Sequence, residues 1–110
     1  MFVVSIDDEK LKEIVRRLVQ ALDPDRIVMF GSRARGDSKP DSDLDLLIVK
    51  DSAEPRHRRT IPGYYALAGL GIPIDILWRT AAEIAEWERV PNHVTTRAIR
   101  EGKILYERAA

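Results

Sequence analysis

RIVMFGSRARGDSKPDSDLDLLIV, residues 26–49, places two short apolar segments on either side of a polar connection rich in glycine and aspartate. The first segment, 26–30, is apolar and partly β-branched, which favours a buried strand. The second, 43–49, begins by alternating aspartate with leucine and continues as an apolar run, so it predicts another strand. The connection, 31–42, has room for one helical turn at 33–35. This stretch therefore predicts two strands of a sheet.

The segments outside this stretch alternate between helical and extended patterns. Apolar residues at helical spacing over 11–22 predict a helix that begins at a capping box of Ser5 and Asp8 and stops at Asp23-Pro24. The further expected elements are an exposed loop or fraying helix start over 50–60, a helix from Pro62 to about Leu70 ended by Gly71, a strand over 72–78, a helix from a Thr80 capping box to about Arg89, a helix capped by Asn92 and ended by Gly102, and an edge strand over 103–107. With no repeat or linker, residues 1–110 are expected to form one α/β domain.

Composition excludes several classes of protein. The 110 residues are 45% hydrophobic and 33% charged and contain no cysteine, so neither disulfides nor thiolate zinc sites can form. No apolar run approaches the roughly 20 residues of a membrane-spanning helix, and charges at 7–10 interrupt any secretory signal, so we expect a cytoplasmic protein without a membrane partner. A formal net charge of zero argues against a long nucleic acid as partner. It also favours association, including a homo-oligomer.

Three aspartates are the candidate catalytic residues. Asp43 and Asp45 are two residues apart in an extended segment, so their side chains leave the same face of the sheet. Such a pair repels itself unless a cation lies between the carboxylates, and Mg²⁺ is a hard ion that prefers these oxygens. Asp75 interrupts an apolar strand and would join them if that strand lies beside the second. The alternative is a solvated turn whose acids cap backbone donors.

Gly31-Ser32 follows the first strand directly. Glycine allows a phosphate close to the backbone, and Ser32 can cap a helical turn whose N–H groups face an anion. An ordinary strand-to-helix turn would use the same dipeptide. A Walker-type phosphate loop is excluded because Asp37 stands where its lysine should be, and an EF-hand is excluded by Leu46 in place of its glycine. His57 and His93 have no second nitrogen or sulfur ligand nearby in sequence, which indicates surface histidines.

Together these motifs carry a resemblance. Gly31-Ser32, ten intervening residues and then Asp43-x-Asp45 resemble the G-S-x10-D-x-D signature of the DNA polymerase β-like nucleotidyltransferases. The sequence from Gly31 to Gly36 and around Asp43 is similar to that of the minimal nucleotidyltransferase (MNT) branch. Asp75 falls at the position where that family carries its third carboxylate. The resemblance covers about 14–77, with a similar ending near 102–107. It implies an α+β nucleotidyltransferase fold like the palm of polymerase β, a small mixed β-sheet with helices packed on it.

The resemblance also implies roles for individual residues. Asp43 and Asp45 would hold two Mg²⁺ ions, and Asp75 would complete the acceptor-side ion and assist deprotonation or serve only as a ligand. Gly31 and Ser32 would bind the terminal phosphates of ATP. A further pair, which would either neutralise phosphate or pair with Asp37 or Asp41, is Arg33 and Arg35.

MNT domains of this kind pair with helical HEPN-type toxins. The resemblance therefore implies an antitoxin, a protein adenylyltransferase that moves AMP from ATP to a tyrosine hydroxyl of its toxin. Two alternatives stay open: a stand-alone adenylyltransferase of small molecules, and a non-catalytic nucleotide-binding module that masks a partner by contact. Candidate aromatic residues for a partner-facing surface, or for core packing, are Tyr64, Tyr65, Trp78 and Trp87.

Overall fold

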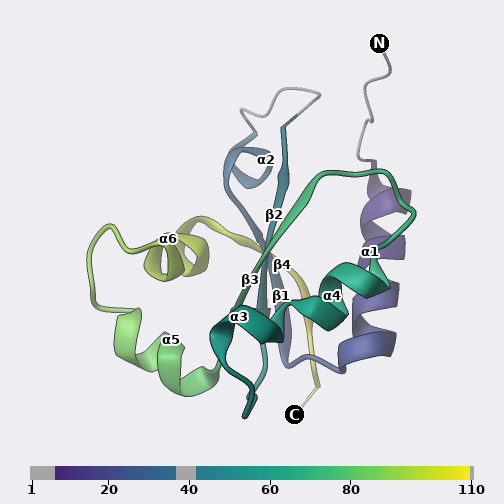
Figure 1. Ribbon diagram of the computed structural model, residues 1–110. Helices are drawn as coiled ribbons and strands as arrows, with labels where there is room; N and C mark the ends of the chain where they lie inside the picture. Colours follow the sequence, from purple (N-terminus) through teal and green to yellow (C-terminus); the bar gives the residue numbers. More distant parts are fainter. Residues whose placement is uncertain (1–6, 37–41, 110) are drawn as a thin grey trace.

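A four-stranded mixed sheet forms the centre of the computed structural model, which describes residues 7–36 and 42–109 (Figure 1). The strands are β1 (Arg26–Phe30), β2 (Leu44–Val49), β3 (Ile74–Arg79) and β4 (Lys103–Glu107). The helices are α1 (Asp8–Leu22), α2 (Ser32–Arg35), α3 (Arg56–Arg59), α4 (Ile61–Ala66), α5 (Ala81–Trp87) and α6 (Val94–Glu101). The predicted α/β class, with helices packed on a small mixed sheet, is confirmed.

The strand order is β3-β2-β1-β4. β1 is antiparallel to β2 and β4, whereas β2 and β3 are parallel. The parallel pair requires a crossover, because parallel neighbours cannot be joined by a tight hairpin. The crossover contains α3 and α4, and it returns the chain to the end of the sheet at which β2 also begins.

Helices cover both faces of the sheet (Figure 1). On one face, α1 and the end of α4 pack on the larger core cluster, whose members from the sheet include Leu44, Leu46 and Ile48. On the other face, α6 packs on a smaller cluster that includes Leu47 and Val49. Because side chains alternate along β2, the residues on the α6 face are the odd-numbered ones. This alternation decides which helix faces the aspartates.

Several predicted boundaries were wrong for local reasons. α4 ends at Ala66 because the chain tightens into a turn and Gly69 adopts a left-handed φ of 88°. β3 begins at Ile74 rather than residue 72, after Pro73, which has no N–H to donate to a neighbouring strand. The cap of α1 is Asp7, which accepts from the Lys10 N–H at 2.9 Å; Ser5 lies outside the described residues.

The start of α6 also differs from the prediction. Asn92 has a left-handed φ of 64° and lies in a turn, and His93 caps the helix instead. Its Nδ1 accepts from the Thr95 N–H at 3.1 Å, and its ring stacks on Trp87 with centroids 4.2 Å apart. His93, predicted to be a surface histidine, is half-buried, and these two contacts hold its ring against its neighbours.

Glu83 connects α3 to α5. It completes the predicted capping box with Thr80 and accepts hydrogen bonds from Arg56 and Arg59 at 2.9 and 2.6 Å. Burial alone would raise the pKa of Glu83, but the hydrogen bonds from Thr80 and the two arginines outweigh it and lower the pKa to about 2. The carboxylate therefore stabilises the fold only while it is ionised.

Glu83→Ala is expected to lower the free energy of unfolding at pH 7 by about 2–3 kcal/mol, because Arg59 loses its charged partner and the helix loses part of its cap. Since the pKa is depressed in the folded protein, this advantage is present above the unfolded pKa and disappears as the pH falls toward 2. Urea denaturation between pH 7 and pH 3 measures the difference. A gap that stayed constant over this range would contradict the assignment.

In the part of the chain that the structure describes, no helix is long and apolar enough to cross a membrane.

Candidate functional site

Two of the three candidate aspartates lie opposite each other on neighbouring strands. Asp45 of β2 is in register with Asp75 of β3, and Asp43 immediately precedes β2. Because parallel strands in register present the same face, both side chains leave the sheet on the α6 side. The condition on which Asp75 would join the other two aspartates, that the third strand lies beside the second, is met. The side chains differ in exposure: Asp43 and Asp75 belong to exposed residues, and Asp45 is half-buried.

The electrostatics of Asp45 reflect this crowding. Burial raises the pKa of the Asp45 carboxyl, and the negative charges of Asp75 and Asp43 raise it further. The positive charge of Arg35 acts in the opposite direction on the same pKa. A carboxylate that is held near two others and one arginine is set up to attract a cation.

The Gly31-Ser32 turn lies against Asp45. Phe30 pairs with Asp45 across the β1–β2 ladder, so the residue after Phe30 passes directly over the carboxylate. A Cβ atom added to Gly31 would lie 2.2 Å from Asp45 Oδ2, and Gly31 has a φ of 77°. Both the space and the backbone angle therefore require glycine here. The positions of the turn and of the Asp45 carboxylate therefore depend on each other.

A cavity of about 330 Å³ opens beside the turn and the carboxylate. Its walls come from the end of β1, from α2, from Asp45 and from one side of α6. The lining residues are Phe30, Gly31, Ser32, Arg35, Asp45, Val94, Arg97 and Glu101. The residues from α6 were not predicted from the sequence. A signal was present, because Val94, Arg97 and Glu101 follow helical spacing and share one face, but nothing in the sequence says which surface that face meets.

The two predicted arginines have different surroundings. Arg33 donates from Nε and Nη2 to the Ser42 carbonyl oxygen at 3.1 and 2.6 Å, so it braces the chain just before the aspartates. Arg35 lines the cavity, and its Nη1 lies 3.8 Å from Glu101 Oε2. The alternative partners, Asp37 and Asp41, lie outside the described residues.

The aspartates supply the oxygen ligands that Mg²⁺ prefers. Within residues 7–36 and 42–109, no cluster of three or more histidine, aspartate or glutamate side chains is arranged to hold a metal ion. Mg²⁺ is usually held by one or two carboxylates together with substrate phosphates rather than by a cage of protein ligands. The in-register pair Asp45 and Asp75, with Asp43 beside it, fits that mode of binding.

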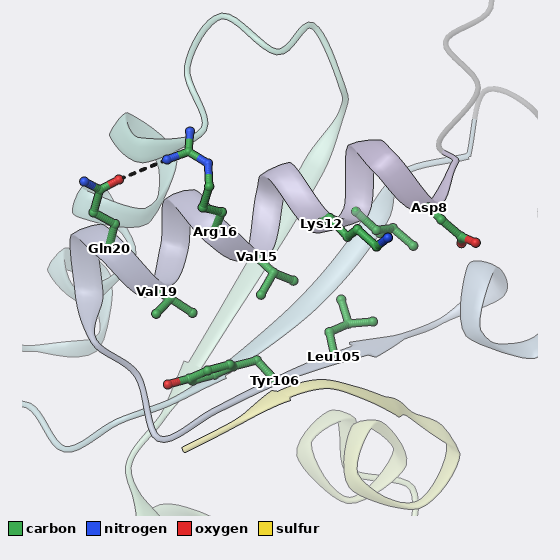
Figure 2. Close-up of a pocket in the computed structure, with 9 residues that line it drawn as sticks. Asp8, Lys12, Val15, Arg16, Val19, Gln20, Leu105 and Tyr106 are labelled. Atoms are coloured by element: carbon green, nitrogen blue, oxygen red, sulfur yellow. Dashed lines mark hydrogen bonds between the residues drawn. The ribbon is translucent and has the colours of Figure 1, made fainter. Parts of the chain in front are cut away.

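A larger hollow lies elsewhere, between α1 and β4 (Figure 2). Its volume is about 770 Å³, and its apolar floor includes Val15 and Val19 from the helix and Leu105 and Tyr106 from the strand. This hollow is on the α1 face of the sheet, opposite to the aspartates. It contains no pair of carboxylates and no glycine turn, so it lacks the groups of the candidate site.

The four aromatic residues proposed for a partner-facing surface divide into two pairs. Trp78 is buried in the main core, and Trp87 stacks on His93. Tyr65 is 79% exposed and Tyr64 is 44% exposed. Tyr64 also accepts a hydrogen bond at its hydroxyl oxygen from the Ile76 N–H, so α4 is fixed to the outer edge of β3. Of these four aromatic residues, only the two tyrosines are exposed enough to contact a partner.

Comparisons with known proteins agree with this geometry. The family model described as a nucleotidyltransferase domain matches residues 8–105. A solved structure from Sulfolobus solfataricus, whose assignment as a nucleotidyltransferase is itself provisional, superposes with a TM-score of 0.64 at 22% identity. The match covers 90% of this chain and 79% of that one, and at this identity it shows a common fold. No curated protein matches the chain.

Proposed function

Since the chain belongs to the nucleotidyltransferase domain family, we propose that it transfers AMP from ATP to a hydroxyl group of a partner protein, a tyrosine of a HEPN-type toxin, and thereby acts as an antitoxin. Transfer of a nucleotide follows from the family. The nucleotide, the acceptor and the partner are the proposed part.

The observation that carries the proposal is the close approach of Gly31 to Asp45. The backbone of the glycine turn passes so near the carboxylate that a Cβ atom added to Gly31 would lie 2.2 Å from Asp45 Oδ2. A phosphate bound at the turn would therefore lie directly beside the carboxylate cluster. Asp75 extends the cluster toward the exposed side of β3, so the acceptor approaches from the side opposite the turn.

The transfer is a substitution at phosphorus. The acceptor hydroxyl oxygen forms a bond to the α-phosphorus of ATP, the bond from that phosphorus to the oxygen bridging to the β-phosphate breaks, and pyrophosphate leaves. The hydroxyl proton passes to a carboxylate. Asp75 suits this role because it is exposed, whereas Asp45 is half-buried against the glycine turn.

Asp43, Asp45 and Asp75 are the residues that would hold Mg²⁺. When bound, two such ions neutralise phosphate charge and lower the pKa of the attacking hydroxyl, as in other two-metal sites. The protein's own part is to fix the turn, the carboxylates and the arginine against one another. Arg35 would add positive charge at the phosphate side of the cavity.

An exposed apolar patch on α4 supports a protein as the partner. Ile61, Tyr64 and Tyr65 are 47%, 44% and 79% exposed, and with Ala68 they border a shallow hollow. Exposed tyrosine is enriched at protein interfaces because the ring buries apolar area while its hydroxyl finds a polar partner. The patch lies on the face of the sheet opposite the aspartates, so a partner that uses it must also reach around the edge strand β3.

Co-expression with the protein encoded by the neighbouring gene is expected to add one or more AMP units to tyrosine of that protein. The gain depends on ATP, on Mg²⁺ and on the carboxylates of Asp43 and Asp45. Intact-mass spectrometry of the neighbour, followed by peptide mapping, measures it. Glu86→Gln, which removes an exposed carboxylate on α5 outside the cavity, serves as a control that should leave the modification unchanged.

The other outcomes identify the alternative functions. An unmodified neighbour that is nevertheless held inactive indicates masking by contact. Efficient adenylylation of a free small-molecule hydroxyl, with the neighbour unmodified, indicates a stand-alone enzyme. Either result overturns the proposed transfer of AMP to the partner, and the second also overturns the antitoxin role.

A further inference from the structure

Arg97 lines the same cavity as the Gly31-Ser32 turn, but from a different element, α6. It lies on α6, in the same stripe of side chains as Val94 and Glu101, and all three line the cavity. Arg97 is exposed, and its side chain makes no hydrogen bond or ion pair with any residue of the described ranges 7–36 and 42–109. The guanidinium is therefore available to a ligand in the cavity.

Arg35 faces the same cavity from α2, but it is engaged. Its Nη1 is 3.8 Å from Glu101 Oε2, and the two side chains are 42% and 45% exposed. An ion pair this long and this exposed contributes little to stability, so an anion can exchange with it at low cost. Glu101 therefore contacts Arg35 at the cavity without binding it tightly.

The charges of the cavity suit a polyanion. Two guanidinium groups, from α2 and α6, flank a half-buried carboxylate that is itself expected to carry a cation. Guanidinium groups bind phosphate oxygens through two parallel hydrogen bonds, which makes arginine the preferred side chain for this contact. We expect a single phosphate on the glycine turn to leave Arg97 without a contact, and a chain of phosphates to contact both the turn and α6.

We propose that Arg97 binds the polyphosphate of the nucleotide from the α6 side, and that Glu101 is a positioning residue that holds Arg35 until the phosphate replaces it. This inference rests on the proposed function of the same site. It adds α6 to the nucleotide-binding surface and assigns the cavity a preference for triphosphate over monophosphate.

The test is titration calorimetry with a non-hydrolysable ATP analogue, with AMP and with inorganic tripolyphosphate, each in the presence of Mg²⁺. Arg97→Ala is expected to weaken binding of the ATP analogue and of tripolyphosphate by about tenfold to a hundredfold. AMP binding is expected to change by less than about threefold, because one phosphate does not reach α6. Arg97→Lys, which keeps the charge but not the forked geometry, should give an intermediate loss.

Arg100→Ala is the matched control. Arg100 is exposed on the same helix but does not line the cavity, so its removal should leave all three affinities within about twofold. Glu101→Gln is expected to tighten binding of the ATP analogue a few-fold, because one carboxylate that competes with the phosphate for Arg35 is neutralised. In an Arg35→Ala background the same Glu101 change should have no effect, which separates a positioning role from a general change in charge.

The outcomes distinguish this inference from the function on which it rests. If wild type binds the ATP analogue and Arg97→Ala binds it equally well, the inference is wrong and the nucleotide site stands. If wild type binds tripolyphosphate but not the ATP analogue, and Arg97→Ala loses it, the polyphosphate contact stands while the nucleotide function fails. If wild type binds none of the three, both are overturned.

Discussion

Replacement of both Asp43 and Asp45 by Asn is expected to abolish nucleotide transfer while the protein stays folded. The two carboxylates are the centre of the negative cluster, and without them no cation balances the phosphates. The expected loss is roughly a thousandfold or more in rate, equal to about 4 kcal/mol of barrier. Release of pyrophosphate from ATP in the presence of the acceptor measures the rate. A double variant that retained full activity would refute the assignment.

The same carboxylates should oppose folding when no metal is bound. Because the pKa of Asp45 is raised in the folded protein, its ionised form at neutral pH costs stability relative to the unfolded chain. The double variant should therefore melt at a slightly higher temperature than wild type at pH 7 without metal. The gap should close as the pH falls through the carboxyl range near about pH 4. Added Mg²⁺ should raise the melting temperature of wild type only.

Gly31→Ala is expected to have the second largest effect. The new Cβ would lie 2.2 Å from Asp45 Oδ2, and the φ of 77° is unfavourable for alanine. The carboxylate and the turn must then move apart. A displacement of about 1 Å at reacting groups can lower a rate by about a hundredfold, and we expect a loss of at least that size. Nucleotide binding should also weaken, because the Gly31-Ser32 turn that is proposed to bind the phosphates moves as well.

Gly36→Ala separates the two causes. Gly36 has a similar φ of 82°, but a Cβ added there would meet no atom of residues 7–36 and 42–109 within 4 Å. It therefore carries the conformational strain, about 1 kcal/mol of stability, without the collision. If both variants lost the same activity, backbone strain and not the contact with Asp45 would be responsible. Melting temperatures and transfer rates of the two variants, measured side by side, decide between the causes.

Strands of the sheet could be predicted from the sequence where an apolar segment stood between clear stop and turn signals. β1 matched its predicted bounds because a short, largely apolar and β-branched segment stands between an Asp-Pro stop and a Gly-Ser turn. The sequence pattern was weaker for α4, where Gly69 and Gly71 allowed several endings and a local turn before Gly69 ends the helix at Ala66. The caps were mistaken because Asp7 and His93 stand close to the residues that the motifs favoured.

The carboxylates of the candidate site could be predicted from the sequence, whereas the residues that α6 contributes to its cavity could not. Asp75 could be grouped with Asp45 because an acidic residue within an apolar strand has few explanations, but the grouping depended on the two strands being neighbours, which the sequence alone did not establish. Arg97 could not be found, because an exposed arginine on an amphipathic helix normally faces solvent, and only the packing of Ala98 and Gly102 against β1 brings that helix to the cavity. The contact of Arg33 with the Ser42 carbonyl oxygen could not be predicted either, because a backbone acceptor leaves no mark in the sequence.

The order of pairing in the sheet has a consequence for how the protein acquires its reactivity as it folds. β1 and β2 are neighbours along the chain, so the hairpin that joins Gly31 to Asp45 closes by short-range contacts. Asp75 arrives only when the crossover through α3 and α4 has brought β3 alongside β2, a contact of much longer range and slower formation. A chain caught between these steps holds the phosphate turn without its third carboxylate. Activity should therefore return later than hairpin structure in a refolding experiment.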